Sequence, residues 1–127
     1  MSNAWKIILG LPGIAFVCVG LLWLLAPGVA GAQFEMALLS GMGLSTQIAD
    51  LASFFLTLGT CILVALATGN RLWFAPAVML LGFAMCGRFI AWFFYGADLA
   101  LSMMAVEFIM ITLILIASQN SKPLQLR

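Results

Sequence analysis

Four long runs of apolar residues dominate the pattern of hydrophobic and polar positions along the chain. A helix needs about 20 mostly apolar residues to cross a hydrocarbon layer about 30 Å thick. Four runs reach this length, at about residues 6–25, 46–68, 72–95 and 99–118. The pattern therefore predicts an all-α fold in which four helices cross a membrane.

The segments between these runs contain residues that favour turns. "TGNR" and "YGAD" connect the last three predicted helices, and connections this short favour antiparallel neighbours. A longer and mostly apolar segment, residues 26–45, separates the first two helices. We predict one transmembrane domain over residues 1–127, a four-helix bundle with an apolar outer loop between its first and second helices.

The stretch "FEMALLSGMGL" within this loop is compatible with three conformations. It could form a short helix in the membrane interface, a re-entrant cap across the bundle, or a plain loop. Gly41 and Gly43 would let the chain turn from this stretch into the second helix.

The first apolar run also resembles a secretory signal, because Lys6 precedes it and Ala30-Gly31-Ala32 imitates a cleavage site. The run is longer than the apolar part of most signals and contains Pro12. We therefore predict that it is a true membrane-spanning helix.

The basic residues give the predicted helices an orientation. Cytoplasmic segments of membrane proteins carry an excess of lysine and arginine. The loop 26–45 and the "YGAD" turn contain Glu35 and Asp98 but neither lysine nor arginine. Four basic residues fall together on the opposite side: Lys6, Arg71, Lys122 and Arg127. We predict that both termini are cytoplasmic, an N-in/C-in topology.

The composition agrees with burial in hydrocarbon. The 127 residues are 65% hydrophobic and 7% charged, and a soluble domain of this size could not hide so much apolar surface. The net charge of +1 argues against nucleic-acid binding, which calls for a basic patch. The absence of histidine argues against ordinary haem ligation and most zinc sites. We expect no metal and no cofactor, although a bound quinone or lipid is left open.

Arg88 and Glu107 lie inside the most apolar part of the chain. At about 1.5 Å per residue, they lie roughly 10 and 12 Å from the outer ends of their helices, and Asp50 lies roughly 6 Å from its own. A charge turned toward lipid near a helix centre costs about 2.5–3.5 kcal/mol. We therefore predict that all three face inward as one charge centre, with Arg88 and Glu107 forming an ion pair. Asp50 would share the guanidinium, be neutral, or reach water on the outer side.

Polar residues around Asp50 recur at helical spacing, and Gln47, Ser53 and Thr57 are the candidates that support the charge centre. Such a stripe either packs against neighbouring helices or lines a small polar cavity. Small residues four apart, Gly82 with Cys86 and Gly87 with Ala91, permit close helix packing. The chain has no histidine base, nucleophile motif or phosphate loop, so we expect no catalytic residue and no enzyme activity.

The segment "GRFIAWFFYGADLALSMMAVEFIMITLILI" resembles the DoxX-like class of small four-helix membrane proteins. That class has an arginine late in the third span, a glycine at the following turn and a glutamate in the middle of the fourth. The matching positions are Arg88, Gly96 and Glu107, and the resemblance covers about residues 46–118. It implies a compact bundle, and some relatives look like accessory partners of membrane oxidoreductases that deal with quinones. Asp50 departs from the class.

Short turns and one apolar loop leave little polypeptide outside the membrane. We expect a non-catalytic accessory or structural subunit of a larger membrane complex, electron-transfer or quinone-linked by the resemblance. The alternative is binding or transport of a small polar ligand, a proton or a quinone at Asp50, Arg88 and Glu107. Expected partners are membrane lipids and other membrane subunits or further copies of the chain. The expected location is a bacterial-type inner (cytoplasmic) membrane. Phenylalanines such as Phe55 and Phe74 are expected to face lipid.

Overall fold

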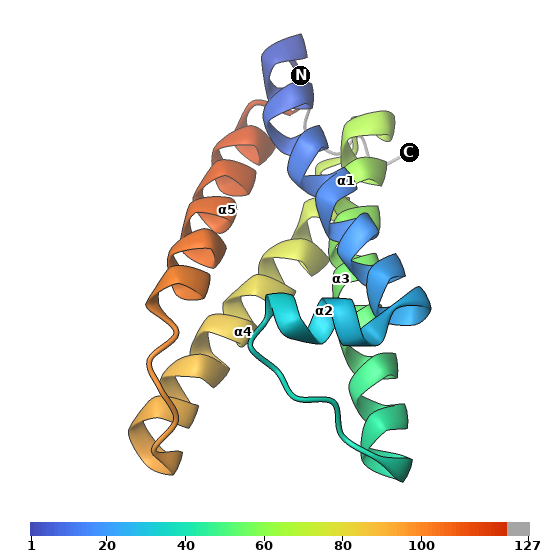
Figure 1. The fold of residues 1–127 in the computed structure, drawn as a ribbon. Helices are drawn as coiled ribbons and strands as arrows, with labels where there is room; N and C mark the ends of the chain where they lie inside the picture. The colour runs from blue at the N-terminus through green and yellow to red at the C-terminus, as the bar shows by residue number, and fades with distance from the viewer. Residues whose placement is uncertain (122–127) are drawn as a thin grey trace.

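The structure is a computed structural model that describes residues 1–121, and every regular element in that part is a helix. In chain order (Figure 1), the elements are α1 (Asn3–Leu25), α2 (Pro27–Gln33), α3 (Gly41–Thr68), the short helix η1 (Arg71–Trp73), α4 (Phe74–Tyr95) and α5 (Leu101–Gln119). Four helices, with η1 and α4 taken together, are long and apolar enough to cross a membrane. The predicted all-α fold with four such helices is confirmed and indicates a multi-pass membrane protein. Lys122 and Arg127, which contributed to the predicted topology, lie outside the described residues.

The long helices end close to the ends of the apolar runs, but two of them begin earlier. α3 and α4 end at Thr68 and Tyr95, the last residues of the predicted spans. α1 already begins at Asn3, and α3 begins at Gly41. An apolar run marks the part of a helix that suits hydrocarbon, whereas the backbone hydrogen bonds continue through flanking polar residues.

The segment between α1 and α3 contains a helix, but this helix precedes the stretch "FEMALLSGMGL", in which the sequence left a helix open. α2 covers Pro27–Gln33, with Pro27 in the first turn, where its missing N–H leaves no hydrogen bond unmade. Residues 34–40 of the stretch "FEMALLSGMGL" form no helix, and its last residues belong to the start of α3. Gly41 has a φ of 56° and turns the chain from this loop into α3.

Glycines allow α1 and α3 to pack with their backbones in contact. A Cβ atom added at Gly59 would lie 2.5 Å from the carbonyl oxygen of Gly13, and one added at Gly20 would lie 2.6 Å from the Leu56 side chain. The predicted packing sites on α4 behave differently, since nothing lies within 4 Å of a Cβ added at Gly82 or Gly87. These two spacings therefore do not mark a helix contact within the chain.

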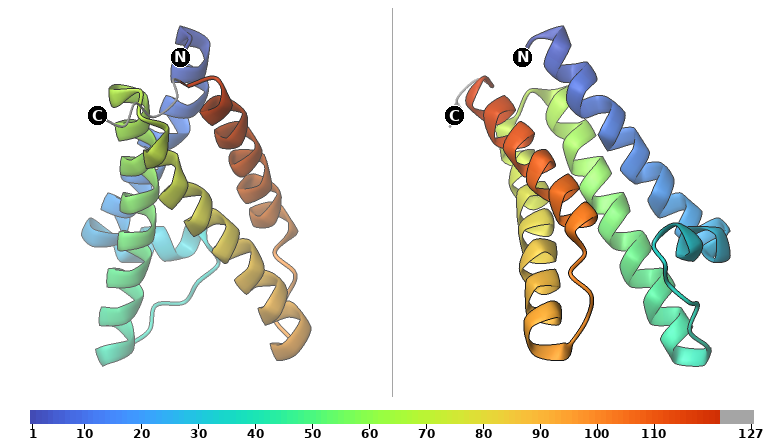
Figure 2. Two further views of the ribbon diagram at one scale, coloured as in Figure 1. Left: turned by 180° about the vertical axis from the view of Figure 1, so that it is seen from behind. Right: turned by 60° about the vertical axis from the view of Figure 1, so that its left-hand side comes forward.

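The four long helices form two pairs, α1 with α3 and α4 with α5, that meet at one end and diverge toward the other (Figures 1 and 2). We call the end that holds the N-terminus the terminal end and the opposite end, near the α4–α5 connection, the open end. The main hydrophobic core takes Leu9, Ile62, Leu81 and Ile114 from the four helices. In α4 the buried residues are Phe74, Ala77 and Leu81, all in its first half. Beyond Leu81, no residue of α4 is buried, which shows how far the pairs have separated.

A second, smaller core lies on the α1–α3 side alone. It consists of Trp23, Ala30, Ala52 and Phe55, from α1, α2 and α3. The α4–α5 pair contributes no buried residue to this cluster. The open half of the molecule therefore has one well-packed wall and one wall that faces it across a gap.

Candidate functional site

Arg88 and Glu107 form an ion pair across α4 and α5. The Nε–H of Arg88 donates a hydrogen bond of 2.9 Å to Oε1 of Glu107. α4 and α5 are antiparallel neighbours joined by a short connection, so side chains at matching distances from that turn can meet. Equal depth in two adjacent helices was the reason for predicting the pair, and the structure contains it.

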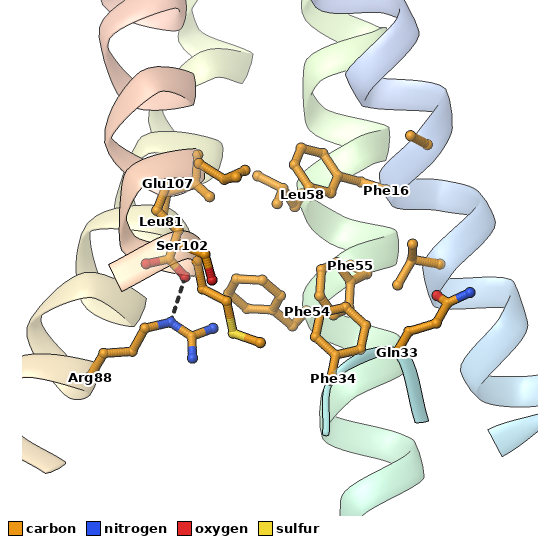
Figure 3. Close-up of a pocket in the computed structure, with 14 residues that line it drawn as sticks. Phe16, Gln33, Phe34, Phe54, Phe55, Leu58, Leu81, Arg88, Ser102 and Glu107 are labelled. Carbon is orange, nitrogen blue, oxygen red and sulfur yellow. Dashed lines mark hydrogen bonds and ion pairs between the residues drawn. The ribbon is translucent and has the colours of Figure 1, made fainter. Parts of the chain in front are cut away.

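This hydrogen bond uses only part of the hydrogen-bonding capacity of the guanidinium and of the carboxylate. The second carboxylate oxygen of Glu107, Oε2, is buried and has no hydrogen-bond partner among residues 1–121. The guanidinium of Arg88 has five N–H donors, and its bond to Glu107 uses the one on Nε. In Figure 3 its two terminal nitrogens point away from Glu107. Buried polar groups without partners are costly, so this site is suited to a further polar group.

The two side chains of the ion pair differ in how far they are exposed. The Glu107 side chain is 8% exposed and the Arg88 side chain 33%. Glu107 is therefore the more deeply buried partner of the pair, and Arg88 is the more accessible one.

The gap between the helix pairs contains two adjoining cavities, which we together call the interhelical cleft. One has a volume of about 400 Å³ and reaches Glu107, and the other has a volume of about 580 Å³. Both are lined by the same central residues: Phe34, Phe54, Phe55, Arg88 and Met103. Volumes of this size are typical of sites for small molecules.

The two walls of the cleft differ in chemistry (Figure 3). On the α1–α3 side, Phe55 packs against three other rings, with centroid distances of 6.2 Å to Phe16, 5.2 Å to Phe34 and 5.1 Å to Phe54. On the α4–α5 side, Arg88 and Glu107 carry the charges and Ser102 adds a hydroxyl group. The cleft thus combines an aromatic wall with a charged wall, an arrangement suited to an amphiphilic molecule.

Several lining residues were not recognised as site residues from the sequence. Phe55 was expected to face lipid, yet it is 9% exposed and lines the cleft, and Phe74 is 2% exposed in the main core. Gln33, at the end of α2, and Ser102 line the cavity beside Glu107. No sequence motif marks these residues, because they meet only through the divergence of the helix pairs.

Asp50 does not join the charge centre, so the predicted three-residue centre is wrong in this respect. Asp50 is exposed and lies beside Met36, Met42 and Gln47 in a separate hollow near the start of α3. Within residues 1–121, Arg88 and Glu107 are the only salt-bridged side chains. Depth along a helix determined the prediction, but direction around the helix decides which groups meet.

The three polar residues predicted to support the charge centre also lie away from the ion pair. Gln47 is buried, but its amide holds the loop before α3: it donates to the carbonyl of Ala37 at 3.1 Å and accepts from the N–H of Leu39 at 3.0 Å. Ser53 and Thr57 are exposed and line neither cavity of the cleft. Their predicted role beside the ion pair is therefore wrong.

Comparisons with protein-family models, with curated proteins and with solved structures give no match to this chain. The resemblance to the DoxX-like class therefore stays a prediction from the residues around Arg88, Gly96 and Glu107. Within residues 1–121, no three His, Cys, Asp or Glu side chains lie close enough together to hold a metal ion.

Proposed function

We propose that this protein binds a small amphiphilic molecule in the interhelical cleft, with the polar head group of that molecule at Arg88 and Glu107. One observation carries the proposal: a partly satisfied ion pair opens onto an aromatic cavity large enough for a small molecule. The apolar part of the ligand would pack on the wall formed by Phe16, Phe54 and Phe55.

The unsatisfied groups define the head group. The N–H groups of Arg88 need an acceptor oxygen, and Oε2 of Glu107 needs a donor such as a hydroxyl. A quinol supplies both kinds of group, because each of its hydroxyls can donate and accept, whereas the oxidised quinone can only accept. A phospholipid with a phosphate and free hydroxyls supplies both at once. The chemistry common to these ligands is an acceptor oxygen and a hydroxyl at the end of an apolar body.

The proposed topology places the open end of the cleft on the outer side of the membrane. Lys6 and Arg71 lie at the terminal end and Asp98 at the open end, which by the positive-inside rule makes the terminal end cytoplasmic. Arg88 is seven residues before the end of α4 at Tyr95, or about 10 Å along the helix. In a bacterial-type inner membrane, the ligand would therefore enter from the outer leaflet.

The proposed role is binding and not catalysis. The cleft offers one guanidinium and one carboxylate that are bonded to each other, with Ser102 as the nearby hydroxyl. Nucleophilic catalysis needs a nucleophile held by a base that a third group orients. The paired charges instead suit recognition of a head group.

The test is thermal unfolding of the full-length protein in detergent, with decylubiquinol and dioleoylphosphatidylglycerol as separate probes. A ligand at 100 times its Kd stabilises the folded protein by about 2.7 kcal/mol, so a saturable rise in unfolding temperature is expected with one of them. Met103→Trp fills the centre of the cleft and should abolish the rise. Met79→Trp, at an exposed position outside the cleft, is the matched control and should keep it. Equal responses from both variants would contradict the proposal.

A further inference from the structure

From Gly43 onward, the exposed side chains of α3 are all small or polar. From Gly43 to the end of the helix, no large hydrophobic residue of α3 is exposed. The exposed residues there are Ser45, Thr46, Ala49, Asp50, Ser53, Thr57, Thr60, Ala67 and Thr68. Thr46, Asp50, Ser53, Thr57 and Thr60 recur every three or four residues and so lie along one face of the helix. We call these five residues the hydroxyl face.

The other three long helices present a different surface. Each exposes bulky apolar side chains along its length, for example Leu11 on α1, Phe93 on α4 and Phe108 on α5, which are 66%, 63% and 61% exposed. Bulky apolar side chains suit contact with acyl chains, whereas small and hydroxyl-bearing ones mark contacts between helices in membranes. The hydroxyl face is therefore unlike the surfaces of this chain that suit lipid.

The contact between α1 and α3 shows the same rule inside this molecule. These helices meet through Gly13, Gly20 and Gly59, and their close approach leaves no room for a Cβ atom at Gly20 or Gly59. Small side chains on the hydroxyl face would permit a second helix to approach α3 from the outside, and the hydroxyl groups could donate across that contact.

Asp50 indicates which charge a helix packed against the hydroxyl face would carry. It lies 18 residues before Thr68, or about 27 Å along the axis, and thus near the far boundary of a hydrocarbon layer about 30 Å thick. Asp50 has no ion-pair partner among residues 1–121. A charge this close to the boundary costs less than one at the centre, but ionisable side chains within membrane spans usually pair with one another, so a lysine or arginine on a neighbouring helix would stabilise Asp50.

Residues 1–121 of a second copy of this chain do not supply that cation. A two-fold axis would place the hydroxyl face against itself and bring one Asp50 toward the other. Among the described residues, Lys6 and Arg71 lie at the terminal end, and Arg88 is bonded to Glu107 in the cleft. Because residues 1–121 of a second copy offer no free cation at this position, we assign the charge that complements Asp50 to a different protein.

We propose that the hydroxyl face docks a transmembrane helix of another protein, and that a lysine or arginine of that helix pairs with Asp50. This is the accessory role in a membrane complex that the sequence led us to expect, now assigned to a surface. It is independent of ligand binding, because Asp50, Ser53 and Thr57 line neither cavity of the cleft. Either proposal can fail without the other.

The test is site-specific photocross-linking of the full-length protein in the membranes of its host. A benzophenone amino acid replaces Thr57 in the middle of the hydroxyl face, with Thr60 as a second site in case the first variant is not inserted. Ile109, exposed on α5, is the matched control position. We expect one discrete product from Thr57 or Thr60 and none from Ile109. Peptide mapping should place the product on a membrane-spanning segment that contains a lysine or arginine.

A charge test then separates the proposed partner from incidental neighbours. Asp50→Lys should lower the cross-link yield about tenfold, and reversing the partner's basic residue to aspartate should restore it. The double variant Arg88→Leu/Glu107→Leu should cross-link like the unaltered protein. Cross-linking to lipid alone, to a second copy of the chain, or to a segment whose yield does not depend on residue 50 would overturn the proposal.

Discussion

The two helix pairs of this molecule are built differently, and the difference explains the cleft. α1 and α3 touch along their backbones at Gly13, Gly20 and Gly59, and they share a second core with α2. α4 and α5 have no such glycine contact, since Gly82 and Gly87 face open space. They are joined instead by a polar contact, the Arg88–Glu107 pair. The tight pair provides a fixed aromatic wall, and the looser pair presents charge to it.

The largest expected effect comes from breaking the tight pair. Gly59→Ala would place a Cβ atom 2.5 Å from the Gly13 carbonyl oxygen, and backbone cannot move away as a flexible side chain would. We expect a loss of about 3 kcal/mol in the free energy of unfolding, or failure to fold. Gly82→Ala is the matched control on the loose pair, where alanine should be neutral or stabilising by up to about 1 kcal/mol. Denaturant unfolding in detergent measures the stability of both variants. Similar stabilities would show that α1 and α3 are not packed more tightly than α4 and α5.

The next effect tests the polar contact of the loose pair. Arg88→Leu leaves the buried carboxylate of Glu107 without its cation and should cost about 2–4 kcal/mol. Glu107→Leu should cost less, about 1 kcal/mol, because the one-third exposed Arg88 can find other partners. The double leucine variant should be more stable than Arg88→Leu alone, since apolar replacement of both partners is often tolerated. Equal costs for the two single variants would mean that the deeper burial of Glu107 does not make it the costlier partner to leave unpaired.

A smaller effect concerns the loop attached to the tight pair. Gln47→Ala removes two hydrogen bonds, to Ala37 and Leu39, and should cost about 1–2 kcal/mol. The change should speed hydrogen exchange at the Leu39 amide while leaving amides of the main core protected. Gln47→Glu is a useful comparison, because it keeps the acceptor for Leu39 and loses the donor to Ala37. If Leu39 exchanges at the same rate in all three proteins, the amide does not hold the loop.

The smallest effect is expected at Asp50. In the isolated protein, Asp50→Asn should change stability by less than about 0.5 kcal/mol, because Asp50 is exposed and unpaired within residues 1–121. Thermal unfolding of purified protein measures this change, and Arg88→Leu serves as the contrasting variant. A loss of stability comparable with that of Arg88→Leu would indicate that Asp50 does interact with Arg88 and Glu107.

The sequence predicted the helices well because hydrocarbon requires long apolar runs, and Thr68 and Tyr95 end two helices as expected. It also predicted the Arg88–Glu107 pair, because a short connection makes depth comparable in adjacent helices. It could not place Asp50, because depth does not determine which way a side chain points around its helix. Gly59 and Gly82 look alike in sequence, and only the packing shows that one of them meets a neighbour. The helix α2 did have a sequence signal, Pro27, in its first turn.

The cleft itself was beyond sequence reasoning for a related reason. Phe34, Phe54 and Phe55 read as apolar residues with nothing to separate them from lipid-facing ones. They become a wall because α4 and α5 diverge from α1 and α3 after the main core ends at Leu81. The angle between the helix pairs depends on many small contacts, so it cannot be predicted from any single residue.

Native mass spectrometry of the protein, extracted from its host membrane in mild detergent, tests the central claim most directly. Our account predicts one bound small molecule per chain, present in the unaltered protein and in Met79→Trp. The same molecule should be absent from Met103→Trp and from the folded Arg88→Leu/Glu107→Leu variant. Retention of an equal amount of that molecule by the double variant would contradict the account.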